Sequence, residues 1–435
     1  MKRTFIHRIV SFFFALVMIF GVASLMAIGA SAAIVDDEKR VSDSVTVSKV
    51  SVNTKGFYLV KDTATVRSST SIFYKKIAVI NKGSLVQVSG ESGDFFKVRY
   101  NINNKNETYF IKKSELKKCA NKTDIKQFVY TTKGARALRE APCNEGTKMN
   151  LAKGTLLLNA GTLRNEAGNI WHIIYRNGKL FYIYEGNVSS CKKITLSIEG
   201  PALMNTKEGE YDFNINVSPK GIGVTVSSSD TAIATVKNNK VTLPGGAGDV
   251  TISAEIPGLT KVSVSSTAII ELSTYFQRTN YTCGASSLLT VLHSRGKLLN
   301  TIDTDISNSA VTENWIVTRL NKQLGAGTYV HKKVKYCGIE KYESILRNSL
   351  RKGHPVILLI AFEKDYFRYT SNGHYVTLIG LVEDENGETW AIVSDSFANR
   401  FKSSEYSCSD SGYVKLPLKT LYDYGKKSKS IIYAS

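Results

Sequence analysis

The sequence predicts a multidomain protein in which two small all-β barrels and a β-sandwich precede a C-terminal α+β domain. The first observation is the length of 435 residues, which exceeds one ordinary domain and allows several hydrophobic cores. The second is an internal repeat with a period of 72 residues, which relates residues 57–119 to residues 129–191. The third is a change of pattern at about residue 273. From there on, some segments have apolar residues at helical spacing and others alternate as strands do.

The first 32 residues have the three parts of a secretory signal peptide. Lys2, Arg3 and Arg8 form a basic segment, an apolar run extends from residue 9 to about residue 29, and residues 30–32 read Ala-Ser-Ala. The run is close to the ~20 residues that span a bilayer, so an uncleaved anchor is the alternative. We expect a secreted or wall-associated extracellular protein of a Gram-positive-type bacterium, with no integral membrane domain beyond the signal sequence.

The charge of the chain favours an anionic partner. The formal charge is +20 at pH 7, and cleavage after residue 32 removes three basic and no acidic side chains, which leaves +17. Outside a cell, the candidate partners are wall polymers and anionic lipid headgroups. The basic residues are scattered among expected strands and follow no nucleic-acid-binding motif, so we expect no nucleic acid partner.

The six cysteines are too few for a disulfide-framework protein of this length, although up to two bridges can form. Cys119 and Cys191 end the two copies of the repeat at equivalent places. An inter-domain bridge between them and two unpaired thiols are both open. Cys337 and Cys408 are expected to be structural thiols or a pair.

After a linker at residues 33–55, the two copies of the repeat are expected to fold as barrels at residues 56–120 and 127–192. Each copy consists of short alternating or aromatic-rich runs broken by Gly, Asn and Ser, which indicates about five to seven strands. The best matches are Lys82-Gly83-Ser84-Leu85-Val86 with Lys153-Gly154-Thr155-Leu156-Leu157, and Tyr109-Phe110-Ile111 with Phe181-Tyr182-Ile183.

Both copies resemble bacterial SH3-like domains. Residues 64–71, and more loosely residues 135–142, resemble an early motif of that family, and residues 95–98 and 171–174 resemble its aromatic strand. The resemblance implies small barrels that dock an enzyme on cell-wall peptide or glycan. A spacer role is the alternative.

Residues 193–272 are rich in Ser, Thr and Val and predict an antiparallel β-sandwich. Alternation runs through residues 228–236, 238–243 and 248–253, interrupted by turn residues. The stretch from residue 228 to residue 242 resembles bacterial immunoglobulin-like domains, with Asn239 where that family usually has glycine. The resemblance implies a spacer, with adhesion as the alternative.

Cys283 stands at the start of an expected amphipathic helix in the last region, residues 273–435. Ala285, Leu288, Leu289 and Leu292 follow at helical spacing, so one face is buried. The free N–H groups at a helix amino end favour a thiolate over a thiol, which is what a nucleophile needs. Gly284 leaves room beside the sulfur for a substrate backbone. Gln277 supplies an amide donor that can join the Cys283 N–H in holding an oxyanion.

His374 is the histidine best placed to act as the base. His293 lies nearly three turns farther along the helix of Cys283, His354 lies in a turn, and His331 lies among lysines on an expected solvated edge. His374 begins an alternating strand, and the next strand ends at Asp395. Two adjacent antiparallel strands would place His374 and Asp395 near one another, in line with the thiol.

Residues 273–435 resemble the papain-like cysteine peptidases of the C39 type, especially the stand-alone C39-like domains of secreted bacterial proteins. The resemblance implies that Cys283 attacks, His374 acts as base and then acid, Asp395 orients His374, and Gln277 lines the oxyanion hole. Two positions depart from the family, which usually has Cys-Gly-Pro and Asp-Pro where this chain has Cys-Gly-Ala and Asp395-Ser396. The carrying motifs are Tyr275-Phe276-Gln277, Asn280-Tyr281, Cys283-Gly284-Ala285, Ser287-Leu288, Gly353, Pro355-Val356, Gly373-His374-Tyr375-Val376, Gly380 and Asp395.

The function expected from these residues is hydrolysis of peptide bonds in a peptide or protein substrate by acyl transfer. The first alternative is a peptidoglycan amidase or endopeptidase, and the second is a non-enzymatic wall-binding adhesin with a degenerate peptidase domain. Wall peptide and anionic wall polymers are the expected partners of the barrels. No metal-ligand spacing and no phosphate loop is present, so no metal and no cofactor is expected.

Overall fold

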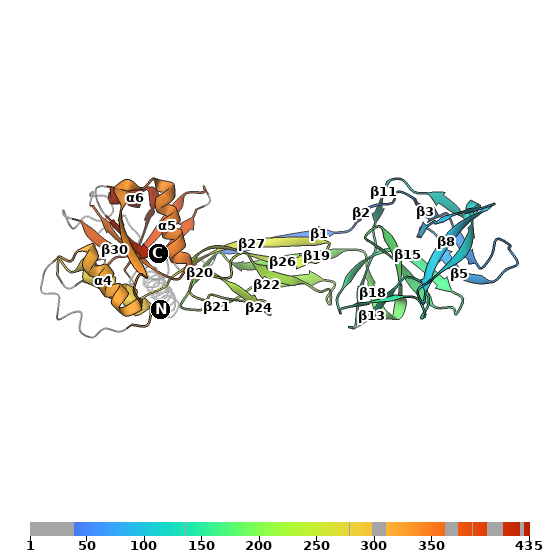
Figure 1. Ribbon diagram of the computed structural model, residues 1–435, viewed down its shortest axis with the longest axis horizontal. Helices are drawn as coiled ribbons and strands as arrows, with labels where there is room; N and C mark the ends of the chain where they lie inside the picture. The colour runs from blue at the N-terminus through green and yellow to red at the C-terminus, as the bar shows by residue number, and fades with distance from the viewer. Residues whose placement is uncertain are drawn as a thin grey trace, which may run out of the picture.

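The computed structural model describes residues 39–134, 136–277, 279–297, 310–361, 373–384, 386–397, 412–426 and 430–435. The expected signal peptide and Cys408 lie outside the described residues. The molecule is elongated, with the N-terminal barrels at one end, a strand-rich middle part, and the C-terminal domain at the other end (Figure 1). No helix of the described ranges is both long enough and apolar enough to cross a membrane.

The two copies of the repeat have a similar order of elements, with a 3-10 turn before the last strand of each, and β15 of the second copy stands where the first copy has β6 and β7. Arg67 pairs with Phe110 in the first copy, and Arg139 pairs with Tyr182 at the equivalent place in the second. The first copy holds β3 (Phe57–Val60), β4 (Thr63–Arg67), β5 (Lys76–Asn81), β6 (Leu85–Gln87), β7 (Gly90–Ser92), β8 (Phe95–Ile102), β9 (Lys105–Lys112), η1 (Lys113–Glu115) and β10 (Leu116–Lys118). The second holds β12 (Phe128–Thr131), β13 (Arg136–Arg139), β14 (Lys148–Leu151), β15 (Leu156–Asn165), β16 (Ile170–Arg176), β17 (Lys179–Tyr184), η2 (Glu185–Asn187) and β18 (Val188–Cys191).

The two copies form one packed body, which we call the barrel pair (residues 56–192). Strand β5 of the first copy pairs antiparallel with β15 of the second, so one sheet runs through both. A single hydrophobic cluster contains Ile80 of the first copy and Leu163 and Trp171 of the second. The described cysteines, Cys119 and Cys191 included, are free thiols, which excludes a bridge between the copies. The SH3-like identity of the copies stays a prediction.

The expected linker at residues 33–55 contributes two strands over its described part, so that assignment is wrong there. β1 (Arg40–Val47) pairs along its whole length with β19 (Ile194–Pro201). β2 (Val50–Asn53) pairs with β11 (Lys122–Ile125), the strand between the two copies of the repeat. The barrel pair is therefore inserted between two neighbouring strands of the middle part, and β1 lies beside β19 and β27 in Figure 1.

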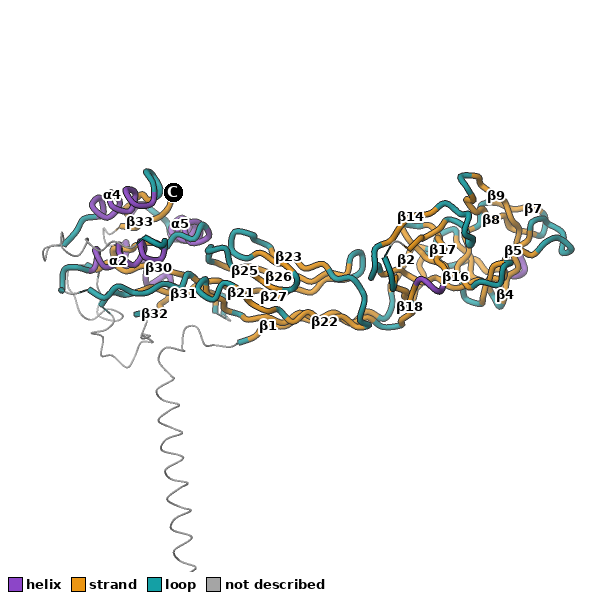
Figure 2. Tube along the Cα trace, turned by 90° about the horizontal axis from the view of Figure 1, so that it is seen from below, coloured by secondary structure: helices purple, strands orange, loops and turns teal. Residues whose placement is uncertain are grey.

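The middle part consists of small sheets around one core that includes Leu196, Ile252 and Val264. Its immunoglobulin-like identity stays a prediction. Besides β1 and β19 it holds β20 (Leu203–Asn205), β21 (Glu210–Asp212), β22 (Asn214–Ser218), β23 (Thr225–Ser228), β24 (Thr235–Lys237), β25 (Lys240–Thr242), β26 (Gly248–Ile256) and β27 (Thr260–Ile269). Figure 2 shows these strands running along the long axis of the molecule.

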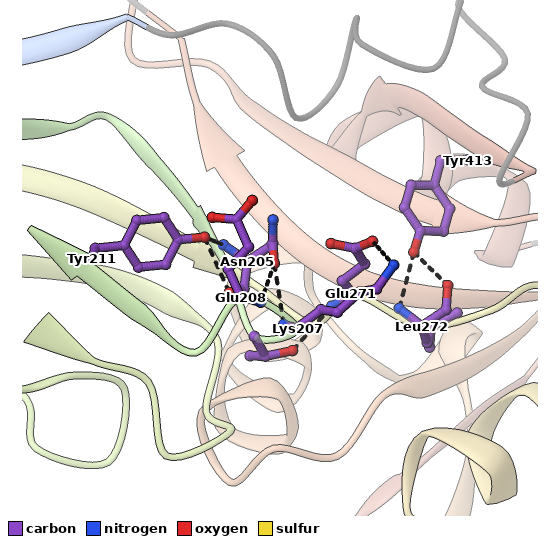
Figure 3. A network of polar contacts seen from close by, with 8 residues as sticks. Asn205, Lys207, Glu208, Tyr211, Glu271, Leu272 and Tyr413 are labelled. Carbon is purple, nitrogen blue, oxygen red and sulfur yellow. Dashed lines mark hydrogen bonds and ion pairs between the residues drawn. The ribbon is translucent and has the colours of Figure 1, made fainter.

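The middle part is fixed to the C-terminal domain by backbone bonds and close packing. Ile270 N donates to Ile379 O at 2.9 Å, and Ala247 N donates to Leu350 O at 2.9 Å. A Cβ on Gly380 would lie 2.6 Å from a methyl group of Ile269, so glycine is required for this approach. Figure 3 shows further contacts at the junction, where the Tyr413 hydroxyl bonds both the N–H and the carbonyl of Leu272.

The C-terminal domain is an antiparallel sheet with helices on both faces. The strand order is β28-β33-β29-β30-β31-β32, and α2 and α4 cover one face while α5 and α6 cover the other. Central strands are therefore buried on both sides. Its elements are α2 (Cys283–Ser294), α4 (Glu313–Leu324), β28 (Tyr329–Lys333), η3 (Val334–Tyr336), α5 (Ile339–Arg351), β29 (Val356–Ile360), β30 (His374–Glu383), β31 (Thr389–Ser394), β32 (Tyr413–Pro417), α6 (Leu418–Lys426) and β33 (Ser430–Ala434).

Candidate active site

Cys283 is the first residue of α2, where the sequence pattern predicted a helix start. Ala285, Leu288 and Leu292 are buried, and α2 packs on β30. This packing holds the amino end of the helix at the start of β30. Cys283 is partly buried, so the fold supports the residue without enclosing it completely.

His374 and Asp395 face each other across two neighbouring strands, as the sequence predicted. β30 begins at His374 and pairs antiparallel with β31, and Asp395 follows the end of β31. His374 Nε2 lies 2.6 Å from Asp395 Oδ1, and each side chain is only 1% exposed. Asp395 is held in place by its own N–H, which donates to Gly412 O at 2.8 Å, and by Phe397 N–H, which donates to Oδ1 at 2.9 Å.

The Cys283 thiol, the His374 imidazole and the Asp395 carboxylate contact one another in that order. Cys283 is hydrogen-bonded to His374. Because Nε2 of His374 is engaged by Asp395, Nδ1 is the ring nitrogen left for the sulfur. The structure therefore brings three of the four candidate residues into one chain of contacts.

The pKa shifts of Cys283 and His374 favour a thiolate on the cysteine and an imidazolium on the histidine. Burial raises the pKa of Cys283, but the hydrogen bond and charge of His374, together with the N–H groups of Tyr375 and Gly284, lower that pKa below its ordinary value. Burial lowers the pKa of His374, but the charge and hydrogen bond of Asp395, with Cys283, raise that pKa to about 10. Both shifts therefore favour the ion pair of thiolate and imidazolium over the neutral pair.

Gln277 lies against the segment that carries Asp395. Its N–H donates to Ser396 O at 2.8 Å, and its side chain is 4% exposed. Its amide nitrogen donates to Thr279 O at 2.8 Å, and its amide oxygen accepts from the Ser396 hydroxyl at 3.0 Å. All four candidate residues are thus brought together at the junction of α2, β30 and β31.

The other histidines of this domain lie away from the thiol. His293 stands near the far end of α2 and packs against Tyr275, with ring centroids 5.5 Å apart. His354 packs against Tyr329, and His331 is exposed on the edge strand β28. Their placement agrees with the choice of His374.

The structure requires glycine at position 284 for a different reason from the one expected. A Cβ at this position would lie 2.5 Å from Val311 and 2.9 Å from the Tyr375 ring. The space beside residue 284 is therefore filled by the protein, and glycine lets α2 approach β30. The expectation that Gly284 leaves room for a substrate backbone is wrong.

Two contributors were missed from the sequence. Ser396 was noted only as a departure from the usual Asp-Pro pair, yet its hydroxyl holds Gln277. The Tyr375 N–H helps to lower the pKa of Cys283, and no side-chain pattern marks a backbone donor. Within the described ranges, no group of three or more His, Cys, Asp or Glu residues could hold a metal ion.

Residues 269–416 match the family model described as the Peptidase_C39 like family. The matched range covers about a third of the chain and contains all four candidate residues. The C-terminal domain is therefore a C39-like, peptidase-type domain. No curated protein matches the chain.

Proposed function

We propose that this chain, with its C39-like C-terminal domain, is a secreted cysteine peptidase that hydrolyses peptide bonds. The observation that carries the proposal is the series of contacts from Cys283 to His374 to Asp395, in which a partly exposed cysteine is backed by a buried imidazole and carboxylate. An ionised thiolate beside an oriented imidazolium is the arrangement that acyl transfer to sulfur requires.

In the proposed reaction, the Cys283 thiolate adds to the carbonyl carbon of the scissile amide. The Gln277 amide nitrogen and the Cys283 N–H donate to the oxyanion. The His374 imidazolium protonates the leaving amine, the C–N bond breaks, and an acyl thioester remains on the sulfur. His374 then takes a proton from water, and the resulting attack releases the carboxylic acid and restores the thiolate and imidazolium.

Alkylation of the purified mature protein with an iodoacetamide probe tests this proposal. We expect Cys283 to react selectively, with a midpoint well below the ordinary cysteine pKa of about 8.5, because its thiolate is stabilised. Cys119 and Cys191 are internal references, because burial raises the pKa of both. Mass spectrometry of samples labelled from about pH 4 to about pH 9 locates the modified residue.

An inert Cys283 would contradict the peptidase proposal. A Cys283 that reacts no faster than the other cysteines would do the same, and it would favour the non-enzymatic adhesin. A reactive Cys283 leads to a screen on peptides and on peptidoglycan fragments. Cleavage of the fragments alone would support the amidase or endopeptidase as the activity.

We also propose that the barrel pair retains the enzyme at the wall. The loop between β4 and β5 exposes Ile72, Phe73 and Tyr74, and Phe73 is 92% exposed. Arg67 Nη1 donates to Ile72 O at 3.0 Å, which holds the loop in shape. This loop forms the end of the molecule farthest from the C-terminal domain (Figure 1). An aromatic side chain held out from a basic protein suits contact with an anionic wall polymer or with sugar rings.

Phe73→Ser is expected to weaken binding of the protein to isolated cell walls about 10-fold, because the most exposed aromatic contact is lost. Co-sedimentation at several salt concentrations measures both the aromatic and the ionic contribution. Met149→Ser is the matched control, since Met149 is an exposed apolar residue elsewhere on the barrel pair. Equal binding of wild type and Phe73→Ser would leave the barrels as spacers.

A further inference from the structure

Ser396 contacts both the backbone and the side chain of Gln277. The Ser396 carbonyl accepts from the Gln277 N–H at 2.8 Å, and the Ser396 hydroxyl donates to the Gln277 amide oxygen at 3.0 Å. Both side chains are nearly buried, with Ser396 2% and Gln277 4% exposed. Buried polar groups are normally hydrogen-bonded, and Ser396 supplies such bonds to Gln277.

The hydrogen-bond partners of the Gln277 side-chain amide allow only one orientation of that amide. The Thr279 carbonyl can only accept, so the amide group at 2.8 Å from it is the nitrogen end. The other end is then the carbonyl oxygen, which needs a donor, and the Ser396 hydroxyl supplies one. The nitrogen carries two hydrogens, and Thr279 takes one. The second hydrogen is the one that the proposed mechanism uses to donate to the oxyanion at Cys283.

We propose that Ser396 is a positioning residue for Gln277, a role that rests on the proposed function. Its hydroxyl keeps the amide oxygen turned away from the site where negative charge develops. A rotated amide would present oxygen to the oxyanion, and the repulsion would oppose acylation. A proline at this position, which the resembled family usually has, carries no hydroxyl.

The same short segment orients the imidazole. Asp395 binds His374, Ser396 binds Gln277, and the Ser394 hydroxyl lies 2.8 Å from the Thr274 hydroxyl. Residues 394–396 thus fasten the strand end that carries Asp395 to the segment that carries Gln277. The acid–base group and the oxyanion donor are set by neighbouring residues of one segment.

Two reagents separate this role from an effect on the thiolate. p-Nitrophenyl acetate acylates the sulfur: the thiolate adds to the ester carbonyl, an oxyanion forms, and p-nitrophenolate leaves as the acetyl thioester remains. Iodoacetamide alkylates the same sulfur by displacing iodide, and no oxyanion forms. The ratio of the two rates at Cys283 therefore reports oxyanion stabilisation alone, after the rates of a Cys283→Ala variant are subtracted.

Ser396→Ala is expected to slow acylation about 10-fold and to leave alkylation unchanged, since removal of a whole oxyanion donor costs roughly 100-fold or more. In a Gln277→Ala background, Ser396→Ala is expected to have no further effect, because the amide that it positions is gone. Ser396→Thr keeps the hydroxyl and is expected to restore most of the acylation rate. Ser266→Ala is the matched control, because Ser266 is a buried serine of the middle part with one hydrogen bond.

Three results would overturn the inference. The first is an equal loss of acylation and alkylation in Ser396→Ala, which would show an effect on the thiolate or the fold. The second is an undiminished acylation rate, and the third is a full additional loss in the Gln277→Ala background. If instead Cys283 of the wild type resists iodoacetamide, the proposed function fails and this inference fails with it.

Discussion

Replacement of Cys283 by alanine is expected to lower peptide hydrolysis by at least about 10,000-fold, with the fold intact. The sulfur is the only atom in the line with His374 and Asp395 that can form the acyl intermediate. The side chain is half-buried and packs at a helix start, so removal of one sulfur atom leaves little to collapse. Initial rates on the best substrate from the screen measure the loss, and circular dichroism checks the fold.

Cys337→Ala is the matched control for this prediction. Cys337 also precedes a helix, since α5 begins two residues later, and it is buried. Its surroundings include Tyr342 and Tyr422, whereas His374 contacts Cys283 and Asp395. The Cys337→Ala variant should therefore keep its activity. Equal activity of wild type and Cys283→Ala would assign any hydrolysis to another group and refute the mechanism.

The line of Cys283, His374 and Asp395 could be predicted because each residue marks the end of a strongly patterned element. The apolar spacing after Cys283 fixed the start of α2. His374 and Asp395 belong to two strands joined by a short turn, and antiparallel neighbours in sequence are usually neighbours in space. The residues of the site could therefore be predicted from local sequence patterns and from the short connection between the two strands.

Pairings between distant segments could not be predicted in this way. β1 pairs with β19, which lies about 150 residues later in the sequence. The polar residues of β1 indicate a linker, and most of its side chains are exposed in the structure. β5 and β15 join the two copies of the repeat through edges that periodicity does not mark. Inside β30, a bulge between Leu378 and Gly380 shifts the alternation, so Leu378 and Ile379 both reach the same core. Such features depend on the assembled sheet.

The placement of the elements also relates the two proposed activities. The loop between β4 and β5, which contains Phe73, and helix α2, which begins at Cys283, lie toward opposite ends of the molecule (Figure 2). The barrel pair shares a core and a sheet, and backbone bonds fix the middle part to the C-terminal domain. A wall contact through the loop would therefore hold the peptidase domain away from the contacted surface.

Asp395→Asn is expected to lower the rate of peptide hydrolysis by about 100-fold to 10,000-fold and to raise the pH at which Cys283 is alkylated. Asp395 supplies the charge and the hydrogen bond that raise the pKa of His374 to about 10, against a burial effect of the opposite sign. Without that charge, burial dominates, and the pKa of His374 falls. The imidazole is then neutral at neutral pH, and Cys283 loses its positive neighbour.

The sign for Cys283 follows from the same balance. Burial raises the pKa of its thiol, and the His374 charge and hydrogen bond are the main effects that lower it. The alkylation midpoint of Asp395→Asn should therefore move up to or above the ordinary value of about 8.5. Asp384→Asn, at the other end of the same strand pair, is the matched control and should leave the midpoint unchanged. An unchanged midpoint in Asp395→Asn would mean that His374 is not the group that ionises the thiol.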